Sequence, residues 1–261
     1  MIKIDNQIIE QNHFPDGTLL MKCKAERGKI GTITWQYESD AELFTLYSLK
    51  KHLDYVLPGW NVYLCLPYIP NARQDRVKSD EDIFTLKYFA EIINSLKFER
   101  VYVLDPHSSV SEALIENVEV ISPTEYIANA IAECNPDLIF YPDEGAMKRY
   151  SGMAEMEYAF GIKRRDWATG KIEGLDIAGC VDKIKGSAIL IIDDICSRGG
   201  TFYHSAKKLK ELGAKKIYLY ITHCENTILE GELLTSGLIE KVYTTNSIFT
   251  KEHKKIEVFE L

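Results

Sequence analysis

The sequence between residues 188 and 201, Ala-Ile-Leu-Ile-Ile-Asp-Asp-Ile-Cys-Ser-Arg-Gly-Gly-Thr, is the most informative part of the chain. Its aliphatic run predicts a buried strand, and two carboxylates and a Gly-Gly-Thr turn then open a helix. Amides at a helix N-terminus bind anions, glycines let a ligand approach the backbone, and the hydroxyls of Ser197 and Thr201 add donors. Asp193 and Asp194 offer acceptors to vicinal sugar hydroxyls. A solvated acidic turn is the alternative, but the position at the carboxyl end of a strand favours a site for a phosphorylated ribose.

Strand-length apolar runs alternate with helical patterns along the whole chain, which is typical of α/β layers with a mainly parallel sheet. A length of 261 residues suits two such domains, and the Ser122-Pro123 junction separates two halves of similar pattern. We therefore predict an N-terminal domain at 1–122 and a C-terminal domain at 123–261.

Element boundaries follow from periodicity and from Gly, Pro and capping residues. Asp40 is expected to cap the first helix, which ends at Pro58-Gly59, and a charged turn at 24–28 is expected to join the first two strands. The chain from 164 to 171 is expected to be basic and irregular. Further helices are predicted at 83–96, 124–134, 144–151 and 200–212. Strands are predicted at 17–23, 29–37, 61–66, 101–104, 118–121, 138–141, 157–163, 188–192, 216–222, 242–244 and 256–261.

Composition excludes several classes of protein. A net charge of −8, from 31 basic and 39 acidic residues, argues against a protein that binds nucleic acid over its whole surface. No apolar run is long enough for a membrane span, and the first residues do not form a signal peptide. The 6 cysteines are scattered without zinc spacing, so we interpret them as reduced thiols of a cytoplasmic protein.

A second motif follows the strand predicted at 61–66. Residues 66–76 read Leu-Pro-Tyr-Ile-Pro-Asn-Ala-Arg-Gln-Asp-Arg. Taken alone, Arg73 and Arg76 are explained equally well as solvated cations paired with Asp75 and Asp80. A planar guanidinium, however, also suits phosphate oxygens and the face of a purine.

These motifs carry a resemblance to a known family. The segment 191–201 resembles the phosphoribosyl-binding fingerprint that type I phosphoribosyltransferases share with ribose-phosphate diphosphokinases. The segment 67–76 is similar to the ATP-contacting stretch of the diphosphokinases, which plain phosphoribosyltransferases are not expected to carry. Further similar motifs occur in the family order, at Phe14-Pro15-Asp16-Gly17, Asp105-Pro106-His107, Pro142-Asp143-Glu144-Gly145 and Lys163-Arg164-Arg165. The chain thus resembles a short, phage-type member of the diphosphokinase family.

The resemblance implies two tandem phosphoribosyltransferase-like domains and a role for each matched residue. The N-terminal domain is expected to contact ATP and the C-terminal domain to bind the ribose phosphate. Implied ATP contacts are Phe14, Asp16, Gly17, Arg73, Gln74 and His107. Implied catalytic residues are Lys163, Arg165 and His107, and implied Mg²⁺ ligands are His107 and Asp143. Implied acceptor contacts are Asp193 and Asp194 for the ribose hydroxyls, and Ser197, Arg198, Gly199, Gly200 and Thr201 for the phosphate.

The implied reaction transfers the β,γ-pyrophosphoryl group of ATP to the anomeric hydroxyl of ribose 5-phosphate, which gives 5-phosphoribosyl-1-pyrophosphate and AMP. The expected cofactor is Mg²⁺, and the expected protein is a cytoplasmic homo-oligomer, at least a dimer, without nucleic-acid or membrane partners. Three rival classes stay open: a phosphoribosyltransferase, a non-catalytic regulatory homologue and a nucleotide-sensing module.

Departures from the family pattern bear on the acceptor. The strand and helix that usually precede the Phe-x-Asp-Gly element are not expected here, so the usual hexamer and its allosteric sites do not follow from the resemblance. Thr18 stands where the family usually has Glu, and Ser197-Arg198 replaces Asp-Thr in the phosphate loop. Arg198 either pairs with a nearby carboxylate such as Glu225 or helps to hold a diphosphate. The second possibility makes ADP-ribose, the implied acceptor of phage relatives linked to NAD salvage, a close alternative.

Overall fold

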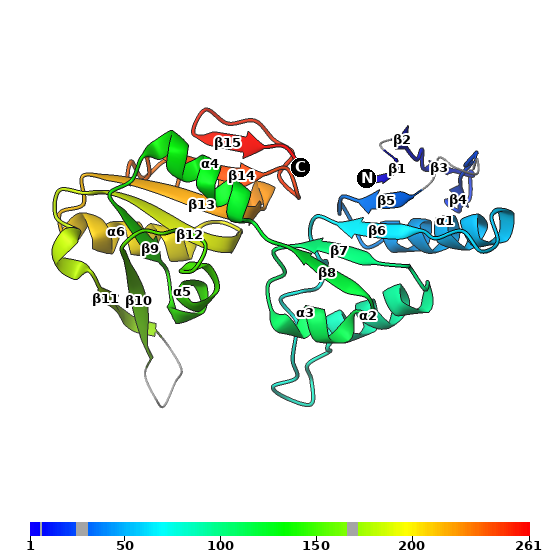
Figure 1. Cartoon of the computed structure of the whole chain (residues 1–261), viewed down its shortest axis with the longest axis horizontal. Coiled ribbons are helices and arrows are strands. Elements are labelled where there is room, and N and C mark those ends of the chain that lie inside the picture. Colours follow the sequence, from blue (N-terminus) through cyan, green and yellow to red (C-terminus); the bar gives the residue numbers. More distant parts are fainter. Residues whose placement is uncertain (6, 25–30, 166–171) are drawn as a thin grey trace. The chain divides into compact units, whose positions relative to one another are not determined.

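The computed structural model describes residues 1–5, 7–24, 31–165 and 172–261, with only the backbone considered at 163–165, 172, 173 and 175. These residues form two compact units, Met1–Ser122 and Pro123–Leu261, each built on its own sheet (Figure 1). No helix among the described residues has both the length and the apolar character needed to cross a bilayer.

The first unit contains a six-stranded sheet in the order β2-β1-β5-β6-β7-β8. β5 to β8 are parallel, whereas β1 and β2 are antiparallel additions at one edge. The strands are β1 (Ile2–Ile4), β2 (Gln7–Ile8), β5 (Thr32–Trp35), β6 (Tyr63–Leu66), β7 (Val101–Leu104) and β8 (Val118–Ile121), and the helices are α1 (Glu42–Val56), α2 (Thr85–Ser95) and α3 (Ser109–Leu114).

One face of this sheet is buried. Alternate residues such as Ile33, Leu64 and Val103 are fully covered, and they pack with the apolar sides of α1 and α2 in one cluster. The residues between them, such as Tyr63 and Tyr102, are only partly covered. Because strand side chains alternate between faces, this pattern fixes the register of β5 to β7.

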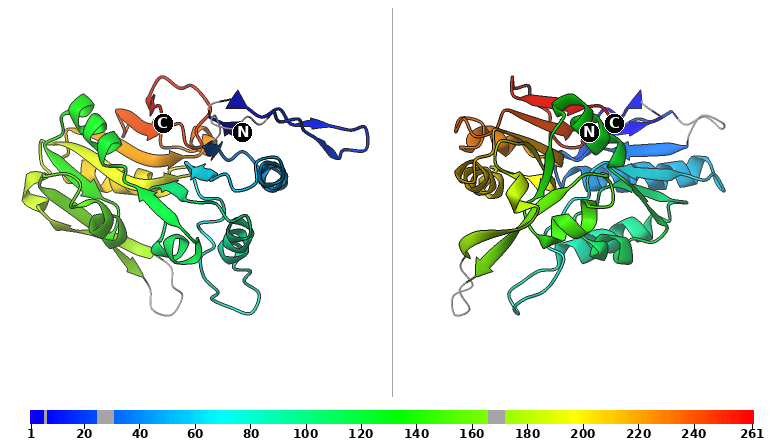
Figure 2. Two further views of the ribbon diagram at one scale, coloured as in Figure 1. Left: turned by 45° about the vertical axis from the view of Figure 1, so that its right-hand side comes forward. Right: turned by 60° about the vertical axis from the view of Figure 1, so that its left-hand side comes forward.

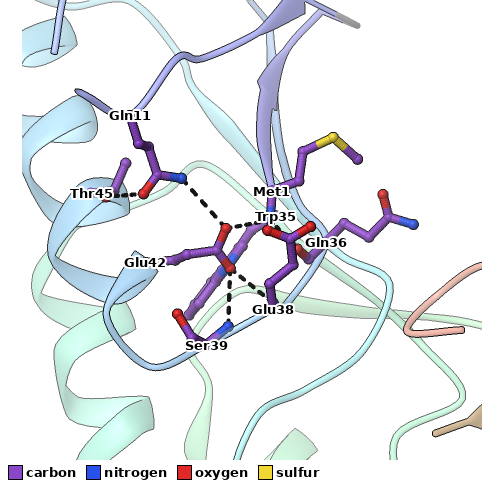
Figure 3. Close-up of polar contacts among 8 residues, drawn as sticks. All are labelled: Met1, Gln11, Trp35, Gln36, Glu38, Ser39, Glu42 and Thr45. Carbon is purple, nitrogen blue, oxygen red and sulfur yellow. Dashed lines mark hydrogen bonds and ion pairs between the residues drawn. The ribbon is translucent and has the colours of Figure 1, made fainter. Parts of the chain in front are cut away.

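The buried carboxylate of Glu42, which is 4% exposed, ties the first strand to α1 (Figure 3). It accepts hydrogen bonds from Trp35 Nε1 and from the Glu38 amide, both at 2.9 Å, and pairs with the Met1 ammonium group. Burial raises the pKa of Glu42, but the bonds from Met1, Trp35 and Glu38 outweigh this effect and hold the pKa below its usual value.

Two expectations for this region are wrong. Ala41 is the residue before α1, and Asp40 instead accepts a hydrogen bond from the Tyr37 hydroxyl at 3.1 Å. Strands β1 and β2 are present before the Phe14 motif, where no strand was expected. Both strands are too short to stand out in the sequence. They are stabilised because β1 pairs with β5 and β2 pairs with β1.

A separate hairpin carries the Phe14 motif. β3 (Asn12–His13) pairs with β4 (Leu19–Leu20), so the predicted strand at 17–23 is shorter and pairs with a preceding strand rather than with 29–37. The left view of Figure 2 shows this blue hairpin extending away from the rest of its unit.

The second unit contains a seven-stranded sheet in the order β11-β10-β9-β12-β13-β14-β15, parallel except for the β10–β11 pair. The strands are β9 (Leu138–Tyr141), β10 (Tyr158–Arg165), β11 (Ile172–Gly179), β12 (Ala188–Cys196), β13 (Lys216–Cys224), β14 (Lys241–Thr245) and β15 (Ile256–Phe259). The α-helices are α4 (Thr124–Cys134), α5 (Glu144–Tyr150) and α6 (Gly200–Glu211), and the 3₁₀ turns are η1 (Val181–Lys183) and η2 (Asn226–Glu230).

Helices cover both faces of this sheet. Ile189 and Ile191 pack with α6 in one cluster, whereas Leu190 and Ile192 pack with α4 and α5 in another. This two-sided burial explains why β12 reads as an uninterrupted apolar run. The strand was expected to end at Ile192, but β12 continues through Cys196. Asp193 and Asp194 therefore lie within the strand and do not follow it.

Candidate active site

The carboxyl ends of β9 and β12 are neighbours in the second sheet, and both carry carboxylates. Asp143 follows β9 and is the N-cap of α5, where its Oδ1 accepts from the Ala146 amide at 3.0 Å. Asp193 and Asp194 lie in the last part of β12, before Ile195 and Cys196. The structure thus brings the predicted metal ligand Asp143 close enough to Asp193 to affect its ionisation.

Arg149 of α5 balances this acidic group. Its Nη1 lies 3.1 Å from Oδ2 of Asp194, and the two side chains are 27% and 8% exposed. Asp194 shares the sheet face of Ile192, which α5 covers, so the alternation of the strand directs it toward Arg149.

Asp193 has no such cation among its described interactions. Burial raises its pKa well above the usual value, and the negative charges of Asp194 and Asp143 raise it further. A carboxylate in this position favours a bound cation or several hydroxyl donors, because either would stabilise its ionised form.

The predicted phosphate loop lies directly after β12. Gly199 has a φ of 80°, a left-handed conformation that favours glycine, and α6 begins at Gly200. The first amides of a helix have no acceptor within the helix, so the start of α6 and the preceding loop form a site suited to an anion. Thr201 lies in the first turn of α6, and Ser197 precedes the glycines. Arg198 Nη2 pairs with Glu230 Oε2 at 3.1 Å, rather than with Glu225.

Lys163 and Arg165 lie near the end of β10, a strand that runs beyond the last paired residue of β9. Their backbones pair with Leu175 and Ile172 of β11. The strand predicted at 157–163 therefore continues through Arg165, so 164–165 is strand and not the irregular loop that was expected. The β10–β11 ribbon extends past the rest of its sheet (Figure 1). The predicted loop beyond it, at 166–171, is outside the described residues.

In the first unit, the turn after β6 carries the second motif. Ala72 and Asp75 are buried, whereas Arg73, Gln74 and Arg76 are exposed. Arg76 binds Asp75 through two contacts, at 2.7 and 3.1 Å, and these bonds hold the pKa of Asp75 below its usual value. Gln74 accepts a hydrogen bond from the Thr85 hydroxyl at 2.9 Å. The turn is therefore a fixed structure that exposes Arg73 and the amide group of Gln74.

His107 lies near this turn. It follows β7, the parallel neighbour of β6, and its charge contributes to the lowered pKa of Asp75. Asp105 is 3% exposed and has a φ of 40°, a conformation that is uncommon for residues other than glycine. The structure thus places His107 beside the Arg73 turn.

The hairpin tip holds the remaining candidates of the first unit. Phe14 is 50% exposed, and Gly17 has a φ of 84° in the turn. The Thr18 hydroxyl and amide both donate to Asp16 Oδ1, at 2.7 and 3.0 Å, and lower its pKa. Asp16 and Thr18 stabilise the turn, and the Phe14 ring remains available for stacking.

Comparisons with known proteins decide the family. The chain is 30% identical to ribose-phosphate pyrophosphokinase of Thermococcus kodakarensis over 251 residues, which cover 93% of this chain and 86% of that protein. The enzyme of the same name from Pyrococcus abyssi is also 30% identical, over 94% of this chain and 86% of its own length. The chain belongs to the ribose-phosphate pyrophosphokinase family. As a member of the ribose-phosphate pyrophosphokinases, which are also called diphosphokinases, it is a transferase.

Two further matches support the architecture of this pyrophosphokinase. Residues 174–260, all in the second unit, match the model of the phosphoribosyl synthetase-associated domain. The crystal structure of phosphoribosylpyrophosphate synthetase from Mycobacterium smegmatis superposes with a TM-score of 0.79 at 18% identity, and the match covers 97% of this chain and 86% of that chain. The predicted α/β class with two tandem sheet domains is confirmed.

Arg149 and Glu230 are the residues near the candidate site of this pyrophosphokinase that the sequence did not reveal. Arg149 occurs beside Lys148 at the end of a short helix, which is an ordinary place for cations. Glu230 lies 32 residues after Arg198 in the sequence, yet the two side chains pair at 3.1 Å. Only tertiary structure brings these partners together.

Proposed function

We propose that this protein transfers the β,γ-pyrophosphoryl group of ATP to the anomeric hydroxyl of ribose 5-phosphate. The hydroxyl oxygen forms a bond to the β-phosphorus, the bond from that phosphorus to the α-phosphate oxygen breaks, and AMP leaves. The hydroxyl proton goes to solvent. The observation that carries the proposal is the pair of carboxylates on β12 beside the glycine loop and the start of α6.

In this proposal the second unit binds the acceptor. Asp193 and Asp194 accept hydrogen bonds from the ribose hydroxyls, and the ion pair with Arg149 holds the Asp194 carboxylate in position for this task. The loop amides and hydroxyls of Ser197, Gly199, Gly200 and Thr201 hold the terminal phosphate. A ribose hydroxyl donated to Asp193 also stabilises an ionised carboxylate that is otherwise disfavoured by its neighbours.

The first unit supplies the ATP contacts in this proposal. Arg73 is exposed, as a group that must reach phosphate oxygens or stack on adenine has to be. Gln74 and His107 lie on the same and the neighbouring turn, and the exposed ring of Phe14 suits stacking on a base. Lys163 and Arg165 then act on the transferred group, where cations stabilise developing charge.

The donor set fits Mg²⁺. Carboxylate oxygens are its preferred ligands, and the raised pKa of Asp193 beside Asp143 marks a place where a cation would be favoured. Among the described residues no group of three or more His, Cys, Asp or Glu side chains could hold a metal ion. In the second unit Asp143 would therefore hold Mg²⁺ together with phosphates and water. In the first unit His107 is proposed separately, from the family resemblance, as a Mg²⁺ ligand. Bound Mg²⁺ would neutralise negative charge on the triphosphate.

The compartment and the oligomeric state of the protein are also proposals. All 6 cysteines are free thiols, which fits a reducing compartment such as the cytoplasm. We propose a homo-oligomer, at least a dimer, in line with the family. Light scattering across a concentration series tests the oligomer.

ADP-ribose is the second candidate acceptor, because Arg198 adds a cation to the phosphate loop. The structure pairs Arg198 with Glu230, and the two side chains are 73% and 60% exposed. An exposed pair is worth about 0–1 kcal/mol, so a diphosphate could displace Glu230. Ribose 5-phosphate is the first candidate because it is the usual acceptor of the family.

One assay tests these proposals together. The protein is incubated with ATP, a divalent metal and either acceptor, and products are identified by mass spectrometry. AMP is expected in step with 5-phosphoribosyl-1-pyrophosphate and only with metal, whereas ADP as the nucleotide product would contradict pyrophosphoryl transfer. Comparing kcat/KM for both acceptors in the wild type and Arg198→Thr then decides the acceptor. A preference for ribose 5-phosphate that Arg198→Thr leaves unchanged removes ADP-ribose.

A further inference from the structure

The phosphate loop rests on a later segment of the chain. We call residues 225–233 the support segment. It begins with a hydrogen bond from the Glu225 amide to the Cys196 carbonyl at 2.8 Å, and it continues through η2. Ile228 and Leu233 are both 0% exposed and belong to the core beneath α6. The segment is therefore anchored in the core on both sides of Gly231.

Two close approaches join this segment to the loop. A methyl group built on Gly231 would overlap the carbonyl oxygen of Arg198 and lie 2.9 Å from its carbonyl carbon. A methyl group built on Gly199 would lie 2.8 Å from Leu233 Cδ2. The atoms facing Gly231 are backbone, so a rotamer change cannot relieve the overlap. Gly231 has to lack a side chain for the loop to keep this path.

The Arg198 carbonyl and the Gly199 amide belong to one planar peptide group. This peptide bond is trans, like every other one among the described residues, so the carbonyl and the N–H point in opposite directions. Since the carbonyl points at Gly231, the N–H of Gly199 points away from the support segment. Any shift of the carbonyl rotates the N–H with it.

We propose that Gly231 is a positioning residue for the phosphate of the acceptor. By receiving the Arg198 carbonyl it aims the Gly199 N–H at the anion, although Gly231 itself does not touch the substrate. The inference rests on the proposed function, because it assumes that this loop holds the acceptor phosphate. In this proposal the support segment orients the N–H of Gly199. A substitution at Gly231 should therefore impair binding of the acceptor and leave binding of ATP unchanged.

Gly231→Ala tests the inference, with Gly152→Ala as the matched control because a methyl group at Gly152 meets nothing within 4 Å. We expect Gly231→Ala to raise the KM for ribose 5-phosphate at least tenfold and to leave the KM for ATP within twofold. The Kd for ribose 5-phosphate from calorimetry without ATP should rise by the same factor, and Gly152→Ala should match the wild type. An unchanged acceptor KM, or an equal rise in both KM values, would overturn the inference.

The wild type separates the two levels of the proposal. If it makes no 5-phosphoribosyl-1-pyrophosphate and binds no ribose 5-phosphate, the proposed function is wrong and the inference falls with it. If the wild type is active and Gly231→Ala binds the acceptor normally, only the inference is wrong. Should Gly231→Ala fail to fold, Leu233→Val is the second variant, because it shortens the side chain that lies against Gly199. It should also raise the KM for ribose 5-phosphate and leave the KM for ATP unchanged. If the KM for ribose 5-phosphate does not rise, the inference is overturned.

Discussion

The two units use the same kind of ion pair in opposite ways. In the turn after β6, the buried carboxylate of Asp75 anchors the Arg76 guanidinium, which is 67% exposed. At the end of β12, the Arg149 side chain, 27% exposed, anchors the buried carboxylate of Asp194. The first arrangement leaves a guanidinium exposed, and the second leaves a carboxylate covered beside a partly covered cation. Phosphate binding is thus expected from the first unit and hydroxyl or metal binding from the carboxylates of the second.

The largest expected effect is a loss of kcat when the cations of β10 are removed from the second unit, which also carries Asp143, Asp193 and Asp194. Lys163→Ala and Arg165→Ala should each lower kcat by about two orders of magnitude or more, roughly 3 kcal/mol, because they remove charge stabilisation of the transition state. Steady-state kinetics measure the loss. Lys183→Ala, which removes an exposed partner of Glu157, is the control, and near-normal turnover in Lys163→Ala would exclude the assigned role.

The next largest effect is expected from removing the ion pair between Arg149 and Asp194 in the second unit. Arg149→Met should lower the free energy of unfolding by about 2 kcal/mol, less than for a fully buried pair, because it leaves the Asp194 charge uncompensated. Acceptor KM should rise as well. Adding Asp194→Asn should restore most of the stability but not the acceptor KM. Arg76→Met is the comparison. A smaller loss, under about 1 kcal/mol in urea unfolding, is expected because the Arg76 cation is 67% exposed and His107 continues to lower the pKa of Asp75.

Asp193→Asn separates binding from stability. A carboxyl whose pKa is raised on folding stabilises the protein below its unfolded pKa, and this stability is lost as pH rises through the folded pKa. At neutral pH the substitution should therefore leave the melting temperature equal or higher, while the acceptor KM rises about tenfold as a charged acceptor is lost. A lower melting temperature with unchanged acceptor kinetics would instead indicate a purely structural carboxylate.

The smallest effect concerns the exposed cation of the first unit. Arg73→Ala should raise the KM for ATP about tenfold, roughly 1.4 kcal/mol, and leave the KM for the acceptor unchanged. Arg100→Ala is the control, because Arg100 precedes β7 and pairs with Glu119 on the surface. An increase in the acceptor KM alone would reverse the division of labour between the two units.

The sequence predicted what depends on local pattern. The fold class, the strands at 101–104 and 138–141 and the helix at 124–134 could be predicted from periodicity, because each element buries apolar residues. The strand at 118–121 was also predicted correctly, although most of its residues are exposed. The Asp40 cap failed because Tyr37 binds Asp40 and the buried Glu42 organises the start of α1 instead.

The site was predictable only in its motif residues. Asp193 could be predicted as a site residue because it directly follows an aliphatic run. The positions of Arg149, Glu230 and Gly231 near the site depend on contacts between residues far apart in the sequence. An ordinary helical arginine and a loop glycine carry no local signal of such contacts. The roles of the motif residues stay predictions until the variants above are measured.

The order of strands in the second sheet has a consequence for how this site forms during folding. β12, β13, β14 and β15 are neighbours in chain order, so their pairing closes short connections. β9 joins β12 from far away in sequence, with Leu138 beside Ile189, and closing that longer loop costs more entropy. We therefore expect amides of β12 and β13 to gain protection from hydrogen exchange before those of β9. We therefore expect Asp193 and Asp194 to become ordered before Asp143 and Arg149, so that the acidic edge of this sheet is complete only when β9 pairs with β12.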